Sequence, residues 1–499
     1  MFFLASARAA RPNTDGMKLA DFGCMLPARS LLAPLTVLAL ATGCTSPLIP
    51  LGPVNAPAYD SPPRALAGPT ERVDATVTEV AGRTAAVVTW DTPEPAESRV
   101  VYGEGGAFDH VATGSTTGGA LHHEVELDGL AGGFSWQVAV EASGPDTEYV
   151  SDPLDVTPAA PTSDIPEPDI TTAATDDVSG YTVTVLVSYP AAVVAVLDRQ
   201  GRYVFWQPVN NIADFRALYD ADSNSLLWLA NATPETTVLW RCALDGQPEA
   251  VATLPLTHHD LTPDPAGGWY VLAYDERPVD SDDGATQDVT GDRLLHVSAD
   301  GADVSTVWSS WDEFPYTGTA ISDGVSTQYP HTNSVSVDPQ SGHVLLSLYE
   351  ADALAMVDPT TGLADWTMGG DDSDWTFQDG ETFSRQHSPL LMTYDEQLAV
   401  FDNGAGTSAD PAEAAVYHLD WISRSATRTW HFDDGGIHRN ITTGSVVPVD
   451  DAGDMLVAWG SDGVLTQVSS AGEVQFSAQF EGNLTGFTSH LATLGSSAD

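Results

Sequence analysis

A strand pattern that repeats six times between residues 196 and 476 limits what this chain folds into more than any other feature. Each copy is an apolar run, a short turn and a second run that often ends on an aromatic residue. The turns lie roughly 45 to 60 residues apart, the period expected of four-stranded propeller blades. Five of the turns carry glycine and the fifth in order carries arginine: Gly201, Gly246, Gly301, Gly362, Arg424 and Gly472.

Further strand-like runs stand between these hairpins, and most of them follow a glycine or aspartate turn. No stretch after residue 44 keeps an apolar stripe with the 3.6-residue period of a helix. We therefore predict an all-β protein whose main domain, residues 171–495, is a six-bladed β-propeller. Two stacked β-sandwiches are the alternative, which the count of six copies disfavours.

The first 44 residues have the layout of an export signal rather than of a folded domain. An apolar run from Leu31 to Ala41 is too short to span a membrane, and it closes on Cys44. The segment resembles a bacterial lipoprotein signal, which implies lipid attachment at Cys44, and a plain secretory signal is the alternative. Met25 is a more natural start than the first residue. We expect an exported protein, anchored only by its lipid at the periplasmic side or cell surface of a bacterial membrane.

The charge balance excludes one broad class of partner. The chain has 70 Asp and Glu against 18 Lys and Arg, a formal net charge of −52, and Lys18 is its one lysine. A surface this acidic does not bind the nucleic-acid backbone. It remains compatible with a local anion site, because salt screens charges over about 8 Å. Cys242 is the one cysteine after Cys44, so no disulfide is expected, and the oligomeric state is not indicated.

Proline-rich segments divide the rest of the chain. Residues 45–68 read as a tether, and residues 158–170 read as a linker to the propeller. Between them, residues 69–157 alternate as short strands, which predicts a β-sandwich. The early Trp90 and the Trp136–Val140 strand resemble a fibronectin type III module. Such modules space or bind rather than catalyse.

Three histidine-led segments precede near-identical strand patterns in the propeller. They contain His258 with His259, His331, and His387. Equivalent positions of a repeated unit can meet at a common centre, and histidine is the side chain best suited to nucleophilic and acid–base work near neutral pH. A single histidine at a strand start is more often structural. Three at matching places predict a shared active site.

Alternation along a strand separates the two adjacent histidines. Alignment of the glycine turns places His259 opposite Asn333 on one strand face. His258 would point the other way, which favours His259 as the member facing the channel, although a one-residue bulge would reverse this choice. The next copy places His387 opposite His331 if its turn is two residues shorter.

These segments also resemble the ordered motifs of the bacterial arylsulfate sulfotransferases, over about residues 180 to 490. The motifs that carry the resemblance are His258-His259-Asp260, His331-x-Asn333-Ser334, the Asp358–Gly362 turn with Trp366 and Gly369-Gly370, Phe383–His387, and Phe401–Gly404. That family is a six-bladed propeller which moves a sulfuryl group from a phenolic sulfate ester to a phenol, through a sulfated histidine and without a nucleotide sulfate donor.

The resemblance implies a role for each matching residue. His387 would be the nucleophile, while His331, Asn333 and one of His258 and His259 would bind the sulfuryl oxygens or handle the phenolic proton. The chemistry suits these residue types, because a neutral imidazole nitrogen can attack sulfur and depart again. The expected partners are an aryl sulfate donor and a phenolic acceptor, and no cofactor is expected.

One position departs from the family pattern. The family carries an arginine in a Ser-x-Arg context after the His-x-Asn segment, and Tyr349 stands there in this chain. Tyrosine cannot replace the charged, bidentate contact that a guanidinium makes to an anion. Arg439 is a candidate to lean into the channel instead, with a solvated loop as the alternative. Thr443 is a loosely placed candidate for the threonine of the family's later Lys-Thr pair.

Two further functions stay open. The same histidines with Asp260 are candidate ligands for a divalent metal in a propeller lyase or hydrolase, although no short His-x-x-x-His spacing supports this. The acidic loops Asp280–Gly284 and Asp371–Asp374 are weaker candidates for Ca²⁺. Alternatively, the chain is a non-catalytic surface lipoprotein whose propeller and sandwich bind a partner, and Tyr349 then marks a decayed site.

Overall fold

The computed structural model describes residues 69–113, 120–175, 178–280, 286–314, 316, 327–392, 396–404, 411–438 and 442–494. The predicted export signal with Cys44, the tether, Arg439 and most of the Asp280–Gly284 loop lie outside the described residues. Within the described part, no helix has the length and apolar character needed to cross a membrane.

The N-terminal strands form two sheets that share one long strand. The first part of β3 (Ala86–Glu104) pairs with β2 (Ala75–Glu79) along one edge and β5 (Ala120–Leu127) along the other, and its last part pairs in the same way with β4 (His110–Thr113) and β6 (Trp136–Ser143). β6 also pairs with β7 (Glu148–Val150) and β8 (Leu154–Val156), and β1 (Thr70–Arg72) pairs with β7. Alternate residues of these strands, among them Trp90 and Trp136, are buried in one core. The likeness to a fibronectin type III module stays a prediction.

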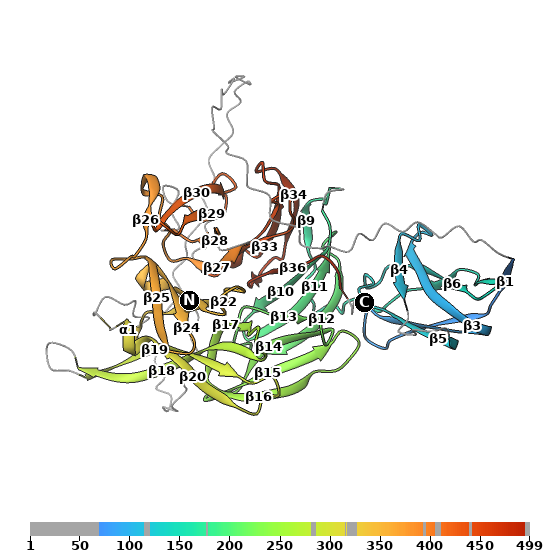
Figure 1. Ribbon diagram of the computed structural model, residues 1–499, viewed down its shortest axis with the longest axis horizontal. Helices are drawn as coiled ribbons and strands as arrows, with labels where there is room; N and C mark the ends of the chain where they lie inside the picture. Colours follow the sequence, from blue (N-terminus) through green and yellow to red (C-terminus); the bar gives the residue numbers. More distant parts are fainter. Residues whose placement is uncertain are drawn as a thin grey trace, which may run out of the picture. The chain divides into compact units, whose positions relative to one another are not determined.

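Six further sheets, built mainly from consecutive antiparallel strands, confirm the all-β fold and the six-bladed propeller (Figure 1). The first three contain β10 (Tyr181–Ser188), β11 (Ala191–Asp198) and β12 (Tyr203–Asn210); β13 (Leu218–Asp220), β14 (Ser225–Thr233), β15 (Thr236–Ala243) and β16 (Glu249–Pro255); and β17 (Thr257–Pro263), β18 (Trp269–Asp280), β19 (Thr286–Val297) and β20 (Val304–Ser309). The last three contain β22 (Thr332–Val337), β23 (Val344–Leu348), β24 (Ala353–Asp358) and β25 (Leu363–Gly369); β27 (His387–Met392), β28 (Gln397–Asp402), β29 (Glu413–Asp420) and β30 (Ser425–Phe432); and β31 (Ser445–Pro448), β32 (Met455–Trp459), β33 (Val464–Val468) and β34 (Val474–Gln479). Shorter elements lie between these strands: α1 (Ser310–Glu313), β21 (Thr327–Gln328), β26 (Thr376–Phe377) and 3₁₀ turns at Tyr349–Ala351, Gln378–Gly380 and Gly460–Asp462.

The hairpins at the predicted turns are all present, because the strands on both sides of each turn pair with one another. Gly362 turns the hairpin β24–β25 with a φ of 71°, in the left-handed region that glycine enters without strain. Arg424 takes the same role between β29 and β30 with a φ of 48°. The repeat therefore depends on turn geometry more than on glycine itself.

The two ends of the propeller close the ring. β9 (Asp169–Thr172) precedes the first sheet but pairs with β34 of the sixth. β35 (Leu484–Thr485) and β36 (Ser489–Leu491) follow the sixth sheet but pair with β10 of the first, and Figure 1 shows β36 beside β10. Opening the ring would therefore break strand pairs formed by both ends of the domain.

Apolar side chains fill the space between each sheet and the next. Six buried clusters each join two neighbouring sheets, so the cores also form a closed ring. The cluster between the fifth and sixth sheets contains Phe401 and Trp459, whose ring centroids lie 5.6 Å apart edge to face. Truncating a buried aromatic side chain of this size to alanine costs about 3–5 kcal/mol. These cores hold the inner strands, on which the histidines lie.

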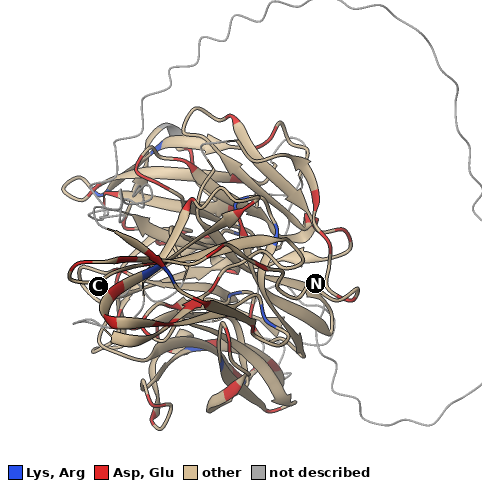
Figure 2. Cartoon of the chain, turned by 90° about the vertical axis from the view of Figure 1, so that its right-hand side faces the viewer, with Lys and Arg blue, Asp and Glu red and all other residues tan. Residues whose placement is uncertain are grey.

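Acidic residues dominate the charge of the folded chain. Figure 2 shows Asp and Glu distributed over strands and loops, with few Lys and Arg among them. The cationic groups that do occur near the propeller centre therefore stand out.

Candidate active site

The three innermost strands that contain or directly follow the predicted histidines share the same irregularity. β17, β22 and β27 lie beside one another in that order. Each breaks register with its partner strand close to its histidine, between Thr257 and Leu261, between Thr332 and Ser334, and between His387 and Leu390. Such bulges re-aim side chains at the rims and centres of sheets.

Left-handed backbone conformations gather at the same place. His259, His331, Ser388 and Thr443 have φ values of 59°, 58°, 49° and 59°. A non-glycine residue in this region costs about 1 kcal/mol or more, and such strain clusters at functional sites. The irregular backbone thus brings side chains together that a regular strand would separate.

The predicted histidines and Tyr349 form a continuous series of ring contacts. His258 and His259 have ring centroids 5.1 Å apart, and those of His259 and His331 are 5.0 Å apart. Tyr349 lies 5.3 Å from His331 and 5.6 Å from His387 by the same measure. Four inner segments of the chain thus converge on one cluster, which we call the histidine cluster (His258, His259, His331, Tyr349 and His387).

His387 is buried and held by hydrogen bonds at both ring nitrogens. Its Nδ1 lies 2.7 Å from Asn403 Oδ1, and the Thr443 N–H donates to its Nε2 over a long 3.3 Å. Asn403 Nδ2 donates to the Thr443 carbonyl at 2.9 Å, which fixes the amide with its oxygen toward the histidine. Because that oxygen only accepts, Nδ1 carries the proton and Nε2 keeps its lone pair.

Burial keeps this imidazole uncharged. It lowers the pKa of His387 to about 3, although the bond to Asn403 acts in the opposite direction. His331 is affected in the same way, since burial lowers its pKa to about 4. Near neutral pH both rings are therefore neutral, the form that attacks as a nucleophile or accepts a proton.

His258 and His259 lie in two different surroundings. The Nδ1 atoms of the two rings are 2.9 Å apart. His259 is half-buried and contacts His331, whereas His258 is buried and stacks on Tyr274 with centroids 4.1 Å apart. Burial first, and then the neighbouring imidazoles of the cluster, lower the pKa of His259 well below its usual value.

Asn333 follows His331 by two residues, and its amide is already engaged in hydrogen bonds. It is fully buried, its Nδ2 donates to the Gln386 carbonyl at 2.8 Å, and its Oδ1 accepts from Ser334 Oγ at 3.0 Å. These bonds tie β22 to the segment leading into His387. A contact from Asn333 to substrate, as predicted, would have to use the second hydrogen of its amide.

An arginine that the sequence analysis did not single out also belongs to this site. Arg216 Nε donates to Asp260 Oδ1 at 2.7 Å, and Arg216 Nη2 donates to Ser388 Oγ at 3.2 Å, one residue beyond His387. Its guanidinium also lies 5.1 Å from the ring centre of Phe487. Arg216 stands outside the repeating hairpins, so no spacing argument could have found it.

The side chains predicted as metal ligands are not arranged as a metal site in the described part of the chain. Asp260, a predicted partner of the histidines in metal binding, instead accepts bonds from Arg216 and from the backbone N–H groups of Leu261 and Val335. Among the described residues, no three His, Cys, Asp or Glu side chains are grouped so as to hold a metal ion, and this includes the Asp371–Asp374 loop.

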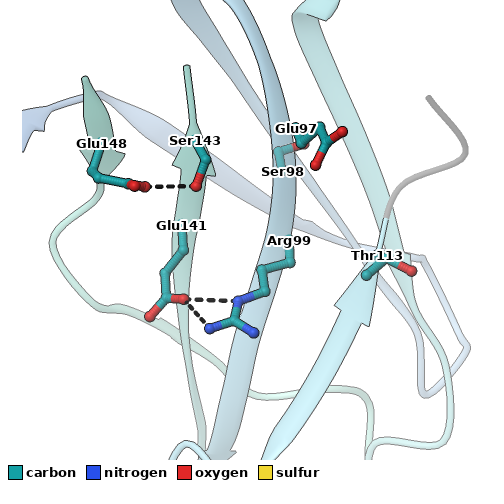
Figure 3. Close-up of a pocket in the computed structure, with 7 residues that line it drawn as sticks. All are labelled: Glu97, Ser98, Arg99, Thr113, Glu141, Ser143 and Glu148. Carbon is teal, nitrogen blue, oxygen red and sulfur yellow. Dashed lines mark hydrogen bonds and ion pairs between the residues drawn. The ribbon is translucent and has the colours of Figure 1, made fainter. Parts of the chain in front are cut away.

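The N-terminal sheets carry a shallow hollow of about 180 Å³, shown in Figure 3. It is lined by three carboxylates, and its one guanidinium is already paired, since Arg99 Nε donates to Glu141 Oε2 at 2.8 Å. Nothing in this arrangement resembles the histidine cluster.

The fold and the cluster together define a β-propeller with a site of buried and half-buried imidazoles. The sequence model of the arylsulfotransferases (ASST) matches residues 171–489, which span the whole ring of sheets. The chain therefore belongs to the arylsulfotransferase family. A search of curated proteins found no match.

Solved structures show only distant likeness. The major Malassezia sympodialis allergen Mala s 1 is 11% identical over 62% of this chain and 95% of that one, with a TM-score of 0.34. Hydrazine synthase of Kuenenia stuttgartiensis is 10% identical over 60% and 79%, with a TM-score of 0.33. AztD from Citrobacter koseri is 10% identical over 83% and 97%, with a TM-score of 0.26. At these TM-scores the likenesses support no conclusion about this chain.

Proposed function

We propose that this protein transfers a sulfuryl group from a phenolic sulfate ester to a phenol, through a sulfated His387 and without a nucleotide sulfate donor. Membership of the arylsulfotransferase family supports the general reaction. The observation that carries the proposal is the state of His387, a buried neutral imidazole whose Nδ1–H donates to Asn403 Oδ1. Its Nε2 lone pair is then the nucleophile.

The first half-reaction follows from this tautomer. Nε2 attacks sulfur, an N–S bond forms, the ester O–S bond breaks, and the phenolate leaves with the bonding electrons. The proton stays on Nδ1, where it is hydrogen-bonded to Asn403 Oδ1, and this bond stabilises the positive charge of the sulfated ring. In the second half-reaction a phenol oxygen attacks the same sulfur, and the N–S electrons return to Nε2.

Two groups near His387 are candidate donors for the sulfuryl oxygens. The Thr443 N–H is only weakly bonded to Nε2 at 3.3 Å, so sulfation of that nitrogen would release it toward a sulfuryl oxygen. Arg216 donates to Ser388, the residue after His387, and its guanidinium is also paired with Asp260. These two groups are our candidates for the anion contact that Tyr349 cannot make.

The direct test is intact-mass spectrometry of the protein after brief mixing with an aryl sulfate, at neutral or mildly alkaline pH because sulfohistidine is acid-labile. We expect a gain of one sulfuryl group in the wild type and none in His387→Ala. His122→Ala is the matched control, since His122 is exposed on β5 of the N-terminal sheets and pairs with Asp91.

Other outcomes point to other functions. No adduct and no phenol release with several donors would contradict the proposal and favour a non-catalytic binding protein. Phenol release without an adduct that stops with a chelator would favour a metal-dependent hydrolase. Export and lipid attachment at Cys44 also remain proposals from the sequence, and labelling of the full-length protein with a fatty-acid probe, with Cys44→Ala beside it, tests them.

A further inference from the structure

A buried carboxylate stands behind the pair His258 and His259, in a position that the proposed reaction has not yet used. Asp292 lies on β19 and is 2% exposed. Its Oδ2 accepts the Thr332 N–H at 2.7 Å, and its Oδ1 lies 3.2 Å from His258 Nε2. The second contact is within ion-pair distance, although its angle is not that of a well-aligned hydrogen bond.

The contacts form an ordered line from the carboxylate to the cluster. His258 joins Asp292 through Nε2 and joins His259 through Nδ1. The stacked Tyr274 ring fixes the plane of His258 between these two partners. His259 in turn contacts His331, so the line ends among the half-buried rings of the cluster.

We propose that Asp292 is a positioning residue that sets the tautomer of His259, and that His259 is thereby the general base which accepts the proton of the incoming phenol. This inference rests on the proposed function. The carboxylate oxygen that lies 3.2 Å from His258 Nε2 can accept a proton but cannot donate one, so we place the proton of His258 on Nε2. The Nδ1 of a neutral His258 is then an acceptor, and His259 must donate from its own Nδ1. His259 Nε2 therefore keeps a lone pair.

The proton and the electrons balance in the second half-reaction. The phenol O–H proton moves to His259 Nε2 while the phenol oxygen forms its bond to sulfur and the N–S bond of sulfated His387 breaks. His259 becomes an imidazolium, which its Nδ1–H bond to His258 and the nearby charge of Asp292 stabilise. The same proton passes later to solvent or to a departing phenolate.

This arrangement also selects among acceptors. A phenol that is already ionised at the assay pH brings no proton, so it does not need the base. A weakly acidic phenol does need it, and general-base assistance is worth about 10²–10⁴-fold. Asp292, His258 and His259 are therefore needed for transfer to weakly acidic phenols, and not for transfer to phenols that are already ionised.

Asp292→Asn is the sharpest variant. The oxygen of the new amide can keep the Thr332 N–H, which leaves its NH₂ facing His258 Nε2. The amide NH₂ then donates to His258 Nε2, and His258 donates from Nδ1 to His259 Nδ1. His259 is left with its proton on Nε2. With 4-nitrophenyl sulfate as donor, we expect the initial release of nitrophenolate to change less than about threefold and transfer to unsubstituted phenol to fall by at least about 30-fold.

Asp288→Asn is the control, because Asp288 is exposed on the same strand. We expect it to leave both half-reactions unchanged. His258→Phe is the second variant if Asp292→Asn folds poorly, since it keeps a ring against Tyr274 and removes the line. His258→Phe should also slow the second half-reaction, transfer to unsubstituted phenol. Equal slowing of both half-reactions, or full transfer to unsubstituted phenol by either variant, would overturn the inference.

A direct reading of the tautomer separates this inference from the proposed function. Long-range ¹H–¹⁵N correlation on histidine-labelled protein, assigned with His259→Gln, should show the proton of His259 on Nδ1 in the wild type and on Nε2 in Asp292→Asn. A wild type with the proton on Nε2 overturns the inference even if sulfuryl transfer is intact. A wild type that forms no adduct overturns the proposed function, whatever the tautomer.

Discussion

The two ends of the histidine cluster hold their imidazoles in opposite ways. His387 is held by neutral partners, the Asn403 amide oxygen and the Thr443 backbone N–H. His259 is held by another imidazole, with the carboxylate of Asp292 behind it. Each Nε2 keeps its lone pair, and Asp292 places a negative charge at the His259 end, where it can stabilise an imidazolium.

This difference suits two different tasks. A nucleophile that must leave again gains from a neutral partner, because a carboxylate would favour the protonated, non-nucleophilic ring. A base that must hold a proton gains from a carboxylate behind it, as in other carboxylate–histidine pairs. The cluster thus separates attack on sulfur from proton transfer, and the changes below disturb one end at a time.

The largest effect is expected at the His387 end. Asn403→Leu removes the acceptor of the Nδ1 proton, so the ring can carry its proton on Nε2 and lose its lone pair there. We expect kcat to fall by about 10²–10³-fold, and stability to fall by about 1–3 kcal/mol because a buried N–H loses its partner. Steady-state kinetics with an aryl sulfate and urea unfolding measure the two changes.

Asn231→Leu is the matched control for this change. Asn231 follows the buried part of β14, a strand that carries none of the cluster residues, and accepts a comparable bond from Thr237 Oγ1 at 2.9 Å. It should lower stability without lowering kcat. If the two variants lower kcat equally, the bond from Asn403 has no special role in orienting His387.

The next effect is on the pH dependence of stability. The pKa of His387 is about 3 in the folded protein against a usual value of 6.5, so the unfolded chain binds an extra proton between these values. The contribution of His387 to the free energy of unfolding is therefore fully present above pH 6.5 and is lost as the pH falls toward 3. Between pH 7.5 and pH 4.5 this one group lowers stability by about 2–3 kcal/mol.

The comparison with His387→Gln isolates this contribution from the many carboxylates that also titrate. Urea unfolding at both pH values should show a smaller acid loss in the variant by about 2–3 kcal/mol. The wild-type kcat/KM should also show no inflection near pH 6.5. A variant that loses stability as steeply as the wild type would mean that His387 takes up its proton in the folded state at an ordinary pH.

A smaller effect should come from behind Thr443. Gly460 begins the 3₁₀ turn after β32, and a Cβ there would lie 1.7 Å from Thr443 Oγ1 and 2.8 Å from the Gly444 N. Gly460→Ala must therefore push Thr443 from its place beside His387. We expect about 1–3 kcal/mol of lost stability and roughly a tenfold lower kcat.

Gly246→Ala is the control for this prediction. Gly246 lies in an outer hairpin turn, and the nearest atom to a new Cβ there is the Ala243 Cβ at 3.1 Å. We expect a small change in melting temperature and none in kcat. An unchanged kcat in Gly460→Ala, together with lowered stability, would show that the position of Thr443 does not matter to His387.

The sequence predicted the outer parts of this fold better than its centre. The six hairpins follow a period of apolar runs and turns, and even Arg424 could be placed because its neighbours keep the period. The inner strands break register at the histidines, and a bulge leaves no mark in a pattern of alternating residues. Which face His258 and His259 present therefore depends on backbone strain that the sequence does not reveal.

The same limit explains which site residues were found. His258, His259, His331 and His387 occupy repeated positions, so their spacing indicated a common centre. Arg216 and Asp292 have no counterpart in the repeat, and only the folded chain brings them to the histidines. Asn403 lay within a motif that carried the family resemblance, but its bond to His387 depends on the pairing of β27 with β28.

The smallest effect is expected at Tyr349, which lies between the two ends of the cluster. Its ring contacts both His331 and His387, and burial raises its pKa, so it remains a neutral phenol at working pH. Tyr349→Phe keeps these ring contacts and removes one hydroxyl. Because a neutral hydrogen bond contributes about 1 kcal/mol, we expect the KM for an aryl sulfate to rise by no more than about fivefold, with kcat nearly unchanged.

Tyr349→Arg completes this test, because it restores the side chain that the family pattern carries at this position. If Thr443 and Arg216 already supply the anion contacts, the added guanidinium should lower KM by only a few-fold and leave kcat almost unchanged. A large gain in kcat would mean that the wild type lacks a contact to the transition state, so that the two ends of the cluster are not sufficient for transfer. A loss of kcat above about 100-fold in Tyr349→Phe would instead place the phenol hydroxyl in the chemistry, as a proton donor shared by both ends.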